Sequence, residues 1–347
     1  MNPTLLPGAG PSSGQIQVLF CCDTGFYQHA AVAMASLLEN NARHRFDIHL
    51  ITAGNDTTAL TKLLASLKRF GNFTFTLHPF NLKSYSHFFT DRHISLEAYL
   101  RLFAPKVLDP TIDKVLYLDC DIVVTGDVGE LWATNLGDKA VAGVWDPYVD
   151  TRRHVLGIAP GRPYINSGVL LFNLKAWRER GVTEKLIACI GARGRELAFH
   201  DQDALNIVLS DSIMLLDYRW NFHVWMFNLK LWQFRDQLPA IRRAARHPAI
   251  LHFTCKEKPW IFESVVPRKY LYYQYLRQTE WRDYKAFDGD WRRLRRYLVN
   301  RLLDGMGIDY RFVRSLDGPK IQRGLRKLGQ RLVSVVSGKG WSQPVRP

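Results

Sequence analysis

Several features are scarce in this 347-residue sequence, and each absence limits the kind of protein it encodes. No uninterrupted apolar stretch approaches the roughly 20 residues that span a bilayer, so we expect no integral membrane protein. The first residues, MNPTLLPGAGPSSGQ, have neither the basic nor the apolar segment of a secretory signal peptide. Cysteine is sparse, and its five residues lack the spacing of a metal site, which favours a reducing, cytoplasmic compartment.

Acidic residues are also few relative to basic ones, and the formal net charge is +15. The excess is concentrated in residues 290–347, which hold 14 Lys and Arg against 4 Asp. WRRLRRYLVNRLL (291–303) and IQRGLRKLGQRLVSVV (321–336) each place apolar residues on one helical face with arginines around it. Basic amphipathic helices are typical of proteins that bind anionic membrane surfaces. The alternative is that both helices pack on the body of the protein; nucleic-acid binding is not expected.

Strands and helices alternate in the first part of the sequence. The patterns predict strands over 16–24, 46–54 and 73–80, with amphipathic helices over 29–40 and 58–71 between them. Such alternation predicts βαβ units on a mostly parallel sheet, an α/β fold. Ligands of open α/β sheets bind beyond the carboxyl ends of the strands, so polar residues there are the first candidates for a site.

The chain divides into three predicted parts. We expect a flexible N-terminus over 1–14, one catalytic domain over 15–288, and a basic helical region over 289–347 that attaches to a membrane surface. Within the domain, ISLEAYLRLFAPKVL (94–108) is predicted to be a helical stretch that leads into the next strand.

The stretch VLYLDCDIVVTGDVGELW (115–132) ends an apolar strand pattern with two carboxylates one residue apart. Residues i and i+2 of a strand point to the same side, so Asp119 and Asp121 would face each other with like charge. That arrangement is unfavourable unless a cation lies between them. Two carboxylates offer hard oxygen ligands to a divalent ion that keeps positions open for phosphate oxygens. The alternative is that the pair only caps the next element.

A second candidate group lies in AILHFTCKEKPW (249–260). His252 follows another predicted strand and could be a third metal ligand as a neutral imidazole, although a lone histidine after an apolar run is often a core residue. Lys258 precedes Pro259 and Trp260, which would restrain the loop, and its ammonium group could neutralise a diphosphate.

Four stretches occur together in an order and spacing that resemble a known family. VLYLDCDIVVTGDVGELW, YINSGVLLFNLKAW, FHDQDALN and LHFTCKEKPW are similar to motifs of the family 8 glycosyltransferases, and the similarity covers residues 16–260. The resemblance implies a GT-A fold, a Rossmann-like single catalytic domain with a mixed, mostly parallel sheet. It also implies a retaining, metal-dependent enzyme, related to glycogenin and to bacterial galactosyl- and glucosyltransferases that build lipopolysaccharide or lipooligosaccharide cores.

The resemblance also assigns roles to individual residues. It implies that Asp119, Asp121 and His252 bind Mn²⁺, or Mg²⁺, at the diphosphate of a UDP-sugar. The other donor-binding residues that it implies are Asp23 and Phe26 at the uracil, Lys258 at the phosphate, Arg101 over the donor, and Asp146 and Asn166 around the donor sugar. Gln202 and Asp201 match residues near the anomeric carbon and are the candidate catalytic pair.

Some of these residues have a plainer alternative. Arg101 could be a solvated residue on an amphipathic helix, Asn166 could bond only to backbone, and the run Asp201–Asp203 could cap the following helix. The chain also departs from the family at Gly25 and Phe26, where the family often has Asn then Tyr. Phe26 could still stack on uracil, but the ribose contact expected from that Asn is absent.

The chemistry of such a transfer explains why these residue types are needed. A nucleoside diphosphate is a poor leaving group until its developing negative charge is neutralised, which a metal ion and a lysine would do. Retention at the anomeric carbon requires either a carboxylate nucleophile on the far face or front-side attack guided by the leaving phosphate. We favour front-side attack, with Gln202 and Asp201 positioning the donor and stabilising an oxocarbenium-like transition state.

The sequence therefore predicts a retaining enzyme that moves galactose or glucose from a UDP-sugar to a saccharide acceptor. The acceptor is expected to be lipid-linked, such as a lipopolysaccharide core, at the inner face of the cytoplasmic membrane. One alternative is an enzyme of the same family that glycosylates a protein or a polysaccharide away from membranes. The other is a non-catalytic GT-A domain that binds sugar nucleotides or glycans.

Overall fold

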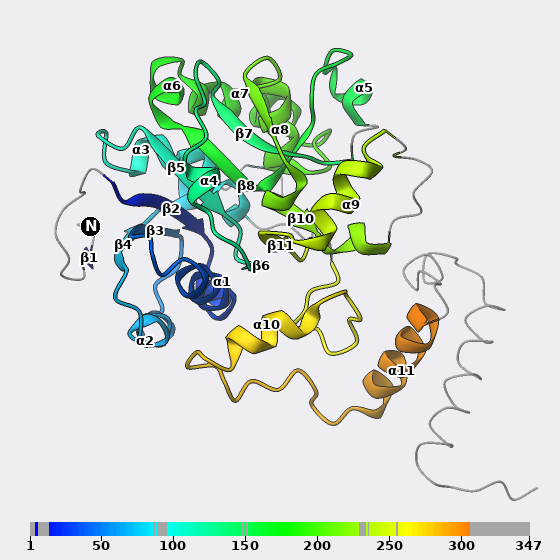
Figure 1. Ribbon diagram of the computed structural model, residues 1–347. Coiled ribbons are helices and arrows are strands. Elements are labelled where there is room, and N and C mark those ends of the chain that lie inside the picture. The colour runs from blue at the N-terminus through cyan, green and yellow to red at the C-terminus, as the bar shows by residue number, and fades with distance from the viewer. Residues whose placement is uncertain are drawn as a thin grey trace, which may run out of the picture. The chain divides into compact units, whose positions relative to one another are not determined.

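The computed structural model describes residues 4–5, 14–85, 88, 96–147, 149, 152–228, 234, 236–254 and 256–305 (Figure 1). These residues form two compact units. The first runs to Thr254 and also includes Tyr273–Arg282, and the second contains the rest. Because each unit has its own packing, the two are described separately.

The strands of the first unit form a large mixed sheet and a small one. They are β1 (Thr4–Leu5), β2 (Ile16–Cys21), β3 (Phe46–Thr52), β4 (Phe73–Pro79), β5 (Lys114–Leu118), β6 (Ile122–Val124), β7 (Val141–Trp145), β8 (Ile165–Asn173), β9 (Ile213–Leu216), β10 (Phe222–His223) and β11 (Ile250–His252). The large sheet has the order β1-β4-β3-β2-β5-β8-β7-β9, and the small one has the order β10-β11-β6. In the large sheet β4, β3, β2 and β5 are mutually parallel, as are β7 and β9, whereas β1 and β8 are antiparallel to their neighbours.

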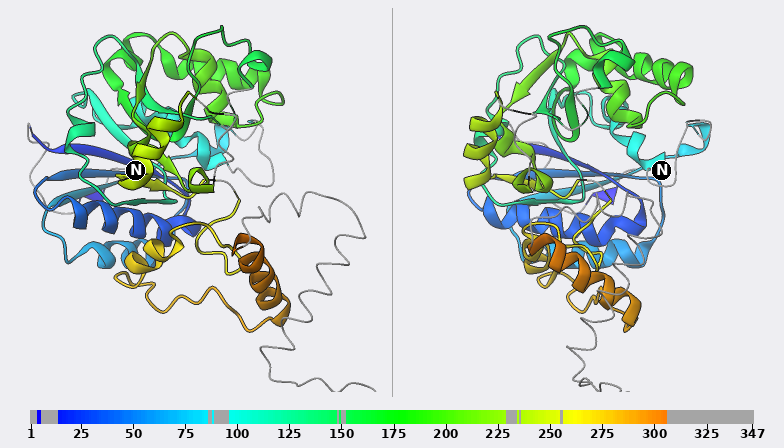
Figure 2. Two further views of the ribbon diagram at one scale, coloured as in Figure 1. Left: turned by 45° about the vertical axis from the view of Figure 1, so that its right-hand side comes forward. Right: turned by 90° about the vertical axis from the view of Figure 1, so that its right-hand side faces the viewer.

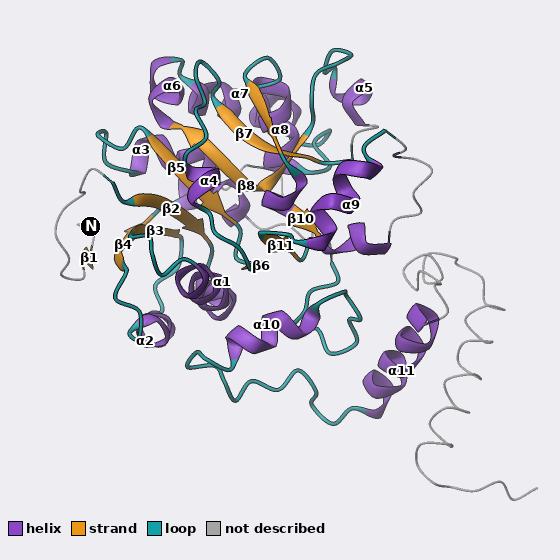
Figure 3. Cartoon of the chain, viewed as in Figure 1, coloured by secondary structure: helices purple, strands orange, loops and turns teal. Residues whose placement is uncertain are grey.

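Helices cover both faces of the large sheet (Figures 2 and 3). The helices of the described residues, taken over both units, are α1 (Tyr27–Asn40), α2 (Thr57–Leu67), α3 (Ala104–Val107), α4 (Gly129–Trp132), α5 (Arg153–Leu156), α6 (Leu174–Glu179), α7 (Val182–Arg193), α8 (His200–Val208), α9 (Leu238–Arg246), α10 (Lys269–Leu276) and α11 (Trp291–Gly305). Short 3₁₀ helices span Thr24–Phe26, Leu82–Tyr85, Leu96–Phe103, Tyr218–Asn221 and Val224–Asn228. Helices α1 and α2 lie on one side of the sheet, and α6, α7 and α8 lie on the other (Figure 1).

The core follows from the alternation of side chains along the strands. Leu19 and Cys21 of β2 join one hydrophobic cluster with Tyr117 of β5 and Trp177 of α6. Residues Val18 and Phe20, which alternate with them and so point to the opposite face, are also fully buried. Strands that are buried on both faces appear in a sequence as nearly continuous apolar runs, and β2 shows this pattern.

These features confirm the predicted α/β fold with a mixed, mostly parallel sheet. The helical stretch predicted over 94–108 is found in its described part, as a 3₁₀ helix over Leu96–Phe103 followed by the separate short α3. Pro105 lacks an N–H and is tolerated only in the first turn of a helix, so an α-helix begins anew at Ala104. Among the described residues no helix combines the length and the apolar character needed to cross a bilayer.

A row of buried polar side chains crosses strands β2, β3 and β4. Gln17 donates a hydrogen bond from Nε2 to Asp47 Oδ2 (2.6 Å) and accepts at Oε1 from His49 Nε2 (2.9 Å). The other ring nitrogen of His49, Nδ1, lies 3.1 Å from His78 Nε2. Burial, followed by the charge of His78, lowers the pKa of His49 to about 3, and burial lowers that of His78 to about 4. Both rings are therefore neutral at physiological pH.

In the second unit, α11 packs through one side on the segment around Glu263. Arg293 forms a two-point ion pair with Glu263, Asn300 Nδ2 donates to the carbonyl oxygen of Glu263 (2.6 Å), and Leu303 packs on Val265. The apolar stripe predicted from sequence, Trp291, Leu294, Leu298 and Leu302, lies on the opposite side of the helix at 100° per residue. Trp291 is 68% exposed. The second basic helix predicted over 321–336 lies outside the described residues.

Candidate active site

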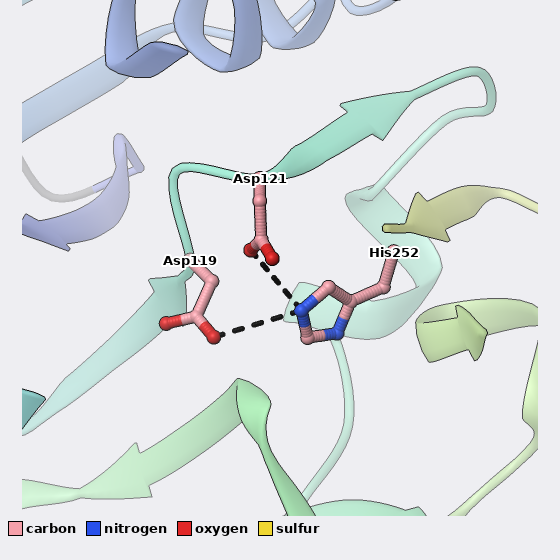
Figure 4. A group of neighbouring side chains, drawn as sticks. All are labelled: Asp119, Asp121 and His252. Atoms are coloured by element: carbon pink, nitrogen blue, oxygen red, sulfur yellow. Dashed lines mark ion pairs between the residues drawn. The ribbon is translucent and has the colours of Figure 1, made fainter. Parts of the chain in front are cut away.

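Three potential metal ligands converge where the large and small sheets meet (Figure 4). Asp119 and Asp121 lie in the turn between β5 and β6, and His252 is the last residue of β11. Strand β11 pairs antiparallel with β6, with His252 opposite Ile122, so the histidine is brought beside the turn. His252 Nε2 is 3.1 Å from Asp121 Oδ1 and 3.7 Å from Asp119 Oδ2.

The predicted reason for the approach of the two carboxylates was wrong, although the grouping itself is found. Asp119 and Asp121 do not lie in a strand, so strand alternation does not align them; the turn does. One potential ligand atom from each of the three residues lies within 4.8 Å of the others. Two carboxylates and an imidazole nitrogen suit Mn²⁺ or a similar divalent ion. The donor set therefore fits the metal implied by the sequence.

Gly168 of β8 leaves the space that this approach requires. A Cβ atom at this position would lie 2.1 Å from His252 Cε1 and 2.8 Å from Asp119 Oδ2. Because real Cβ atoms do not approach other atoms so closely, no other residue fits here without displacing His252. The backbone N–H of Asp119 donates to Gly168 O (2.8 Å), which holds the turn against β8.

Arg101 is a buried residue of the site, which excludes the alternative of a solvated arginine. Its side chain is 9% exposed; Nη1 is 3.1 Å from Asp119 Oδ1 and Nε is 3.3 Å from Asp201 Oδ2. The guanidinium also lies over the ring of Tyr117, 4.5 Å from its centroid. Burial alone would lower the pKa of Arg101, but Asp119 and Asp201 outweigh burial and raise it, so the side chain stays charged.

The oxygen of Asp119 that faces Arg101 is also held by Tyr117, whose hydroxyl donates to Oδ1 (2.5 Å). Asp119 therefore has two differently engaged oxygens. Oδ1 is held by protein donors, and Oδ2 faces His252. Sequence reasoning missed Tyr117, because within VLYL it reads as one more apolar strand residue.

The candidate catalytic pair lies in the first turn of α8, and both members are buried. The amide of Gln202 is oriented by its neighbours: Oε1 accepts from Asn166 Nδ2 and from the backbone N–H of Ser167 (both 3.0 Å), and Nε2 lies 3.3 Å from Asp146 Oδ2. Asp201 Oδ2 accepts no hydrogen bond within the described part of the chain. Burial raises the pKa of Asp201, and Arg101 opposes the rise.

Asp203 has a structural role, although the run does not supply the N-cap of α8, which is Phe199. It accepts hydrogen bonds from the Tyr164 hydroxyl (2.5 Å) and from the backbone N–H of Phe199 (3.0 Å), and it pairs with Arg152 (3.3 Å). The chain enters α8 through His200, whose φ of 43° lies in the left-handed region that non-glycine residues rarely adopt. This local strain is compensated by the contacts of Asp203.

Asn166 and Asp146 belong to the same polar cluster as Gln202. Asn166 Nδ2 donates to Asp146 Oδ2 (3.1 Å) as well as to Gln202, and its Oδ1 accepts from the backbone N–H of Gly168 (2.9 Å) and from Asn221 Nδ2 (2.9 Å). Asn166 therefore does more than bond to backbone. Sequence reasoning also missed Asn221. Its neighbours in the stretch RWNFH (219–223) give no local reason to select it.

The predicted nucleotide-binding residues divide between the two units. Asp23 follows β2, and β2 runs parallel to β5, so Asp23 lies at the same edge of the sheet as Asp119. Asp23 Oδ1 accepts from the backbone N–H of Phe26 (3.1 Å), whose ring is 40% exposed and so available for stacking. Lys258 belongs to the second unit. Its predicted phosphate contact stays a prediction.

The α/β fold, with its carboxylate–histidine cluster at the edge of the sheet, agrees with the glycosyltransferase fold that the sequence motifs implied. The chain belongs to glycosyl transferase family 8, whose sequence profile matches residues 17–263. This membership confirms the resemblance drawn from the sequence motifs, and with it glycosyltransferase activity.

Relatives and solved structures agree with that assignment. General stress protein A of Bacillus subtilis is 29% identical over 77% of this chain and 94% of its own length. Lipopolysaccharide 1,2-glucosyltransferase of Escherichia coli is 25% identical over 77% of this chain and 79% of its own. The structure of galactosyltransferase LgtC with donor and acceptor sugar analogs superposes with a TM-score of 0.69 and 25% identity, covering 76% of this chain and 96% of LgtC.

Proposed function

We propose that the protein transfers galactose or glucose from a UDP-sugar to a saccharide acceptor with retention of configuration. The observation that carries the proposal is the convergence of Asp119, Asp121 and His252 beside a cluster that orients Gln202. Together they would form a metal site beside a polar side-chain cluster, at the strand edge where such folds bind ligands. The similarity to enzymes named for glucosyl and galactosyl transfer supports a hexose donor.

Asp119, Asp121 and His252 would hold Mn²⁺, which when bound neutralises the diphosphate that leaves. Arg101 holds Asp119 in place through its ion pair, and Lys258 is proposed to add positive charge at the phosphates. Asp23 and Phe26 are proposed to bind the uracil.

Around the donor sugar, Asp146 and Asn166 would accept and donate hydrogen bonds to hydroxyl groups. Gln202 is fixed by the Ser167 backbone, so it would orient the sugar without reorganisation during the reaction. Asp201 brings a buried carboxylate oxygen that accepts no hydrogen bond within the described residues. Such an oxygen can stabilise positive charge that develops at the anomeric carbon. We favour front-side attack on this basis.

We further propose that the acceptor is lipid-linked, such as a lipopolysaccharide core, and that residues 289–347 bind an anionic membrane surface. The apolar stripe of α11 supports this, because it faces away from the residues that pack on Glu263 and Val265, with Trp291 68% exposed and Leu294, Leu298 and Leu302 partly exposed. Exposed Arg292 and Arg301 flank it. This combination of apolar and basic residues matches an interfacial helix.

Hydrolysis of a panel of nucleotide sugars, with Mn²⁺ or with EDTA, tests the enzymatic proposal. We expect metal-dependent cleavage of one UDP-hexose, its loss with Asp121→Asn, and full activity with Asp211→Asn, an exposed aspartate used as the matched control. Cleavage of no donor with or without a panel of oligosaccharide acceptors, while UDP still binds, would support the non-catalytic alternative.

Sedimentation with vesicles tests the membrane proposal. The full chain should bind vesicles that contain phosphatidylglycerol but not pure phosphatidylcholine vesicles, and a Leu294→Gln/Leu298→Gln variant should bind them less. Equal binding by this variant would show that the stripe is not the contact surface. Glycosylation of a soluble acceptor without vesicle binding would favour the soluble-enzyme alternative.

A further inference from the structure

Asn221 connects the metal ligands to the donor-sugar cluster. It is fully buried and ends a 3₁₀ helix immediately before β10, which pairs in parallel with β11 so that His223 lies opposite His252. Its two amide atoms have different partners. Oδ1 is 2.8 Å from His252 Nδ1, and Nδ2 is 2.9 Å from Asn166 Oδ1.

The protonation of His252 follows from this chain of contacts, starting at a backbone group whose role is fixed. The N–H of Gly168 can only donate, so the atom of Asn166 that receives it is the oxygen. The atom of Asn221 beside that oxygen must then be the amide nitrogen, and its other atom must be the oxygen. An oxygen at 2.8 Å from His252 Nδ1 requires that Nδ1 carry the hydrogen.

We propose that Asn221 is a positioning residue that holds His252 in the tautomer with hydrogen on Nδ1. The lone pair of Nε2 then points toward Asp119 and Asp121, as a metal ligand requires. This inference rests on the proposed metal site. It adds that the ligand is oriented through Asn166, which also bonds to Gln202 and Asp146, so one hydrogen-bonded chain orients both the metal side and the sugar side.

Two substitutions separate the two contacts of Asn221. Asn221→Leu has similar volume and removes both, so we expect Mn²⁺ to bind 10- to 100-fold more weakly, as in other sites that lose a group orienting a ligand histidine. Asn221→Asp keeps an acceptor for His252 but replaces the donor toward Asn166. It should bind Mn²⁺ at least as tightly as the unsubstituted protein, while donor hydrolysis falls by about tenfold for one lost hydrogen bond.

Mn²⁺ affinity is measured from the electron paramagnetic resonance signal of the free ion, and folding of each variant is checked by circular dichroism. The tautomer is measured without metal, by NMR of protein labelled with ¹⁵N-histidine, with His252 assigned from a His252→Gln variant. We expect hydrogen on Nδ1 in the unsubstituted protein and in Asn221→Asp, and a mixture of tautomers in Asn221→Leu.

The outcomes distinguish this inference from the proposed function. Absence of hydrogen from Nδ1 in the unsubstituted protein, or unchanged Mn²⁺ affinity in a folded Asn221→Leu variant, would overturn the role of Asn221. Failure of the unsubstituted protein to bind Mn²⁺ would instead overturn the metal site itself. Weak Mn²⁺ binding by Asn221→Asp, which keeps the acceptor for His252, would show that this contact does not determine the Mn²⁺ affinity and would also overturn the inference.

Discussion

Replacement of Arg101 by methionine should destabilise the protein strongly, because it leaves two carboxylates without their shared cation. Methionine has a similar length and keeps much of the packing on Tyr117, so the substitution mainly removes charge. Arg101 lies 3.1 Å from Asp119 and 3.3 Å from Asp201, and 91% of its side chain is removed from solvent, as its 9% exposure shows.

The magnitude follows from these distances. Each pair is worth about 5 kcal/mol of Coulomb energy at an effective dielectric constant of about 20, but desolvation of the charges offsets most of this. Breaking a buried pair by removing one partner typically costs about 3–5 kcal/mol. Asp119 keeps the Tyr117 hydroxyl, whereas Asp201 Oδ2 accepts no hydrogen bond among the described residues, so most of the loss arises at Asp201.

Urea denaturation in EDTA, followed by circular dichroism, measures the loss. We expect a decrease of about 4 kcal/mol in the free energy of unfolding, of which adding Asp201→Asn restores at least about 1.5 kcal/mol because a neutral amide needs no counter-ion. Arg69→Met is the control, since the Arg69–Glu39 pair is half exposed and should contribute only about 0–1 kcal/mol.

The pH dependence provides a second check. Burial already raises the pKa of Asp201, and removal of Arg101 raises it further. The folded variant then retains a proton at pH values where the unfolded chain has lost it, so its stability falls as pH rises, and its deficit is larger at pH 8 than at pH 5. A loss below about 1 kcal/mol, or a double variant less stable than Arg101→Met, would refute this account of the site.

Three further predictions address other parts of the molecule. Gly168→Ala should displace His252 and so weaken Mn²⁺ binding 10- to 100-fold, as measured by isothermal titration calorimetry. Gly191→Ala, where a Cβ has open space, is the control and should leave the affinity unchanged. Equal Mn²⁺ affinities of the two variants would contradict the steric argument. The pKa of His49 is lowered to about 3 in the fold, so the unfolded chain takes up a proton at this residue below about pH 6.5 while the folded chain does not. Thermal stability should therefore fall as pH decreases from about 6.5 toward about 4. His49→Gln should make this fall shallower. A profile as steep as that of the unsubstituted protein would exclude His49. Glu263→Gln should increase the hydrogen-exchange rate of α11, because Arg293 and Arg296 lose their ion pairs with Glu263. An unchanged exchange rate would show that packing alone holds the helix.

The part of the fold that could be predicted is the part set by local pattern. Strands β2, β3 and β4 and helices α1 and α2 were expected within a few residues of their observed bounds, because the repeat of apolar residues changes clearly between strand and helix. The segment Leu96–Val107 is helical as predicted, but its amphipathic repeat does not show that a 3₁₀ helix is followed by a short α-helix. Pro105 is the local sign that a new helix begins there.

The site shows the same division between local and non-local information. Asp119 and Asp121 could be selected because two like charges one residue apart, at the end of an apolar run, are unfavourable unless a cation lies between them. The role of Asn221 could not be predicted, since it depends on β10 pairing with β11 and on Asn166 arriving from β8. Likewise, the burial of Arg101 depends on two carboxylates contributed by distant segments.

The pairing of β6 with β11 has a consequence for how the protein is made. On the ribosome, Asp119 and Asp121 emerge long before His252, and β6, the edge strand of the small sheet, has no partner until β11 has been synthesised. Because chains fold from the N-terminus as they emerge, the nascent protein can complete most of its large sheet while its ligand set is still open. A chain that ends before His252 would thus have most of the large sheet but would lack one of the three proposed metal ligands. The proposed metal site can therefore form only after β11 has been synthesised.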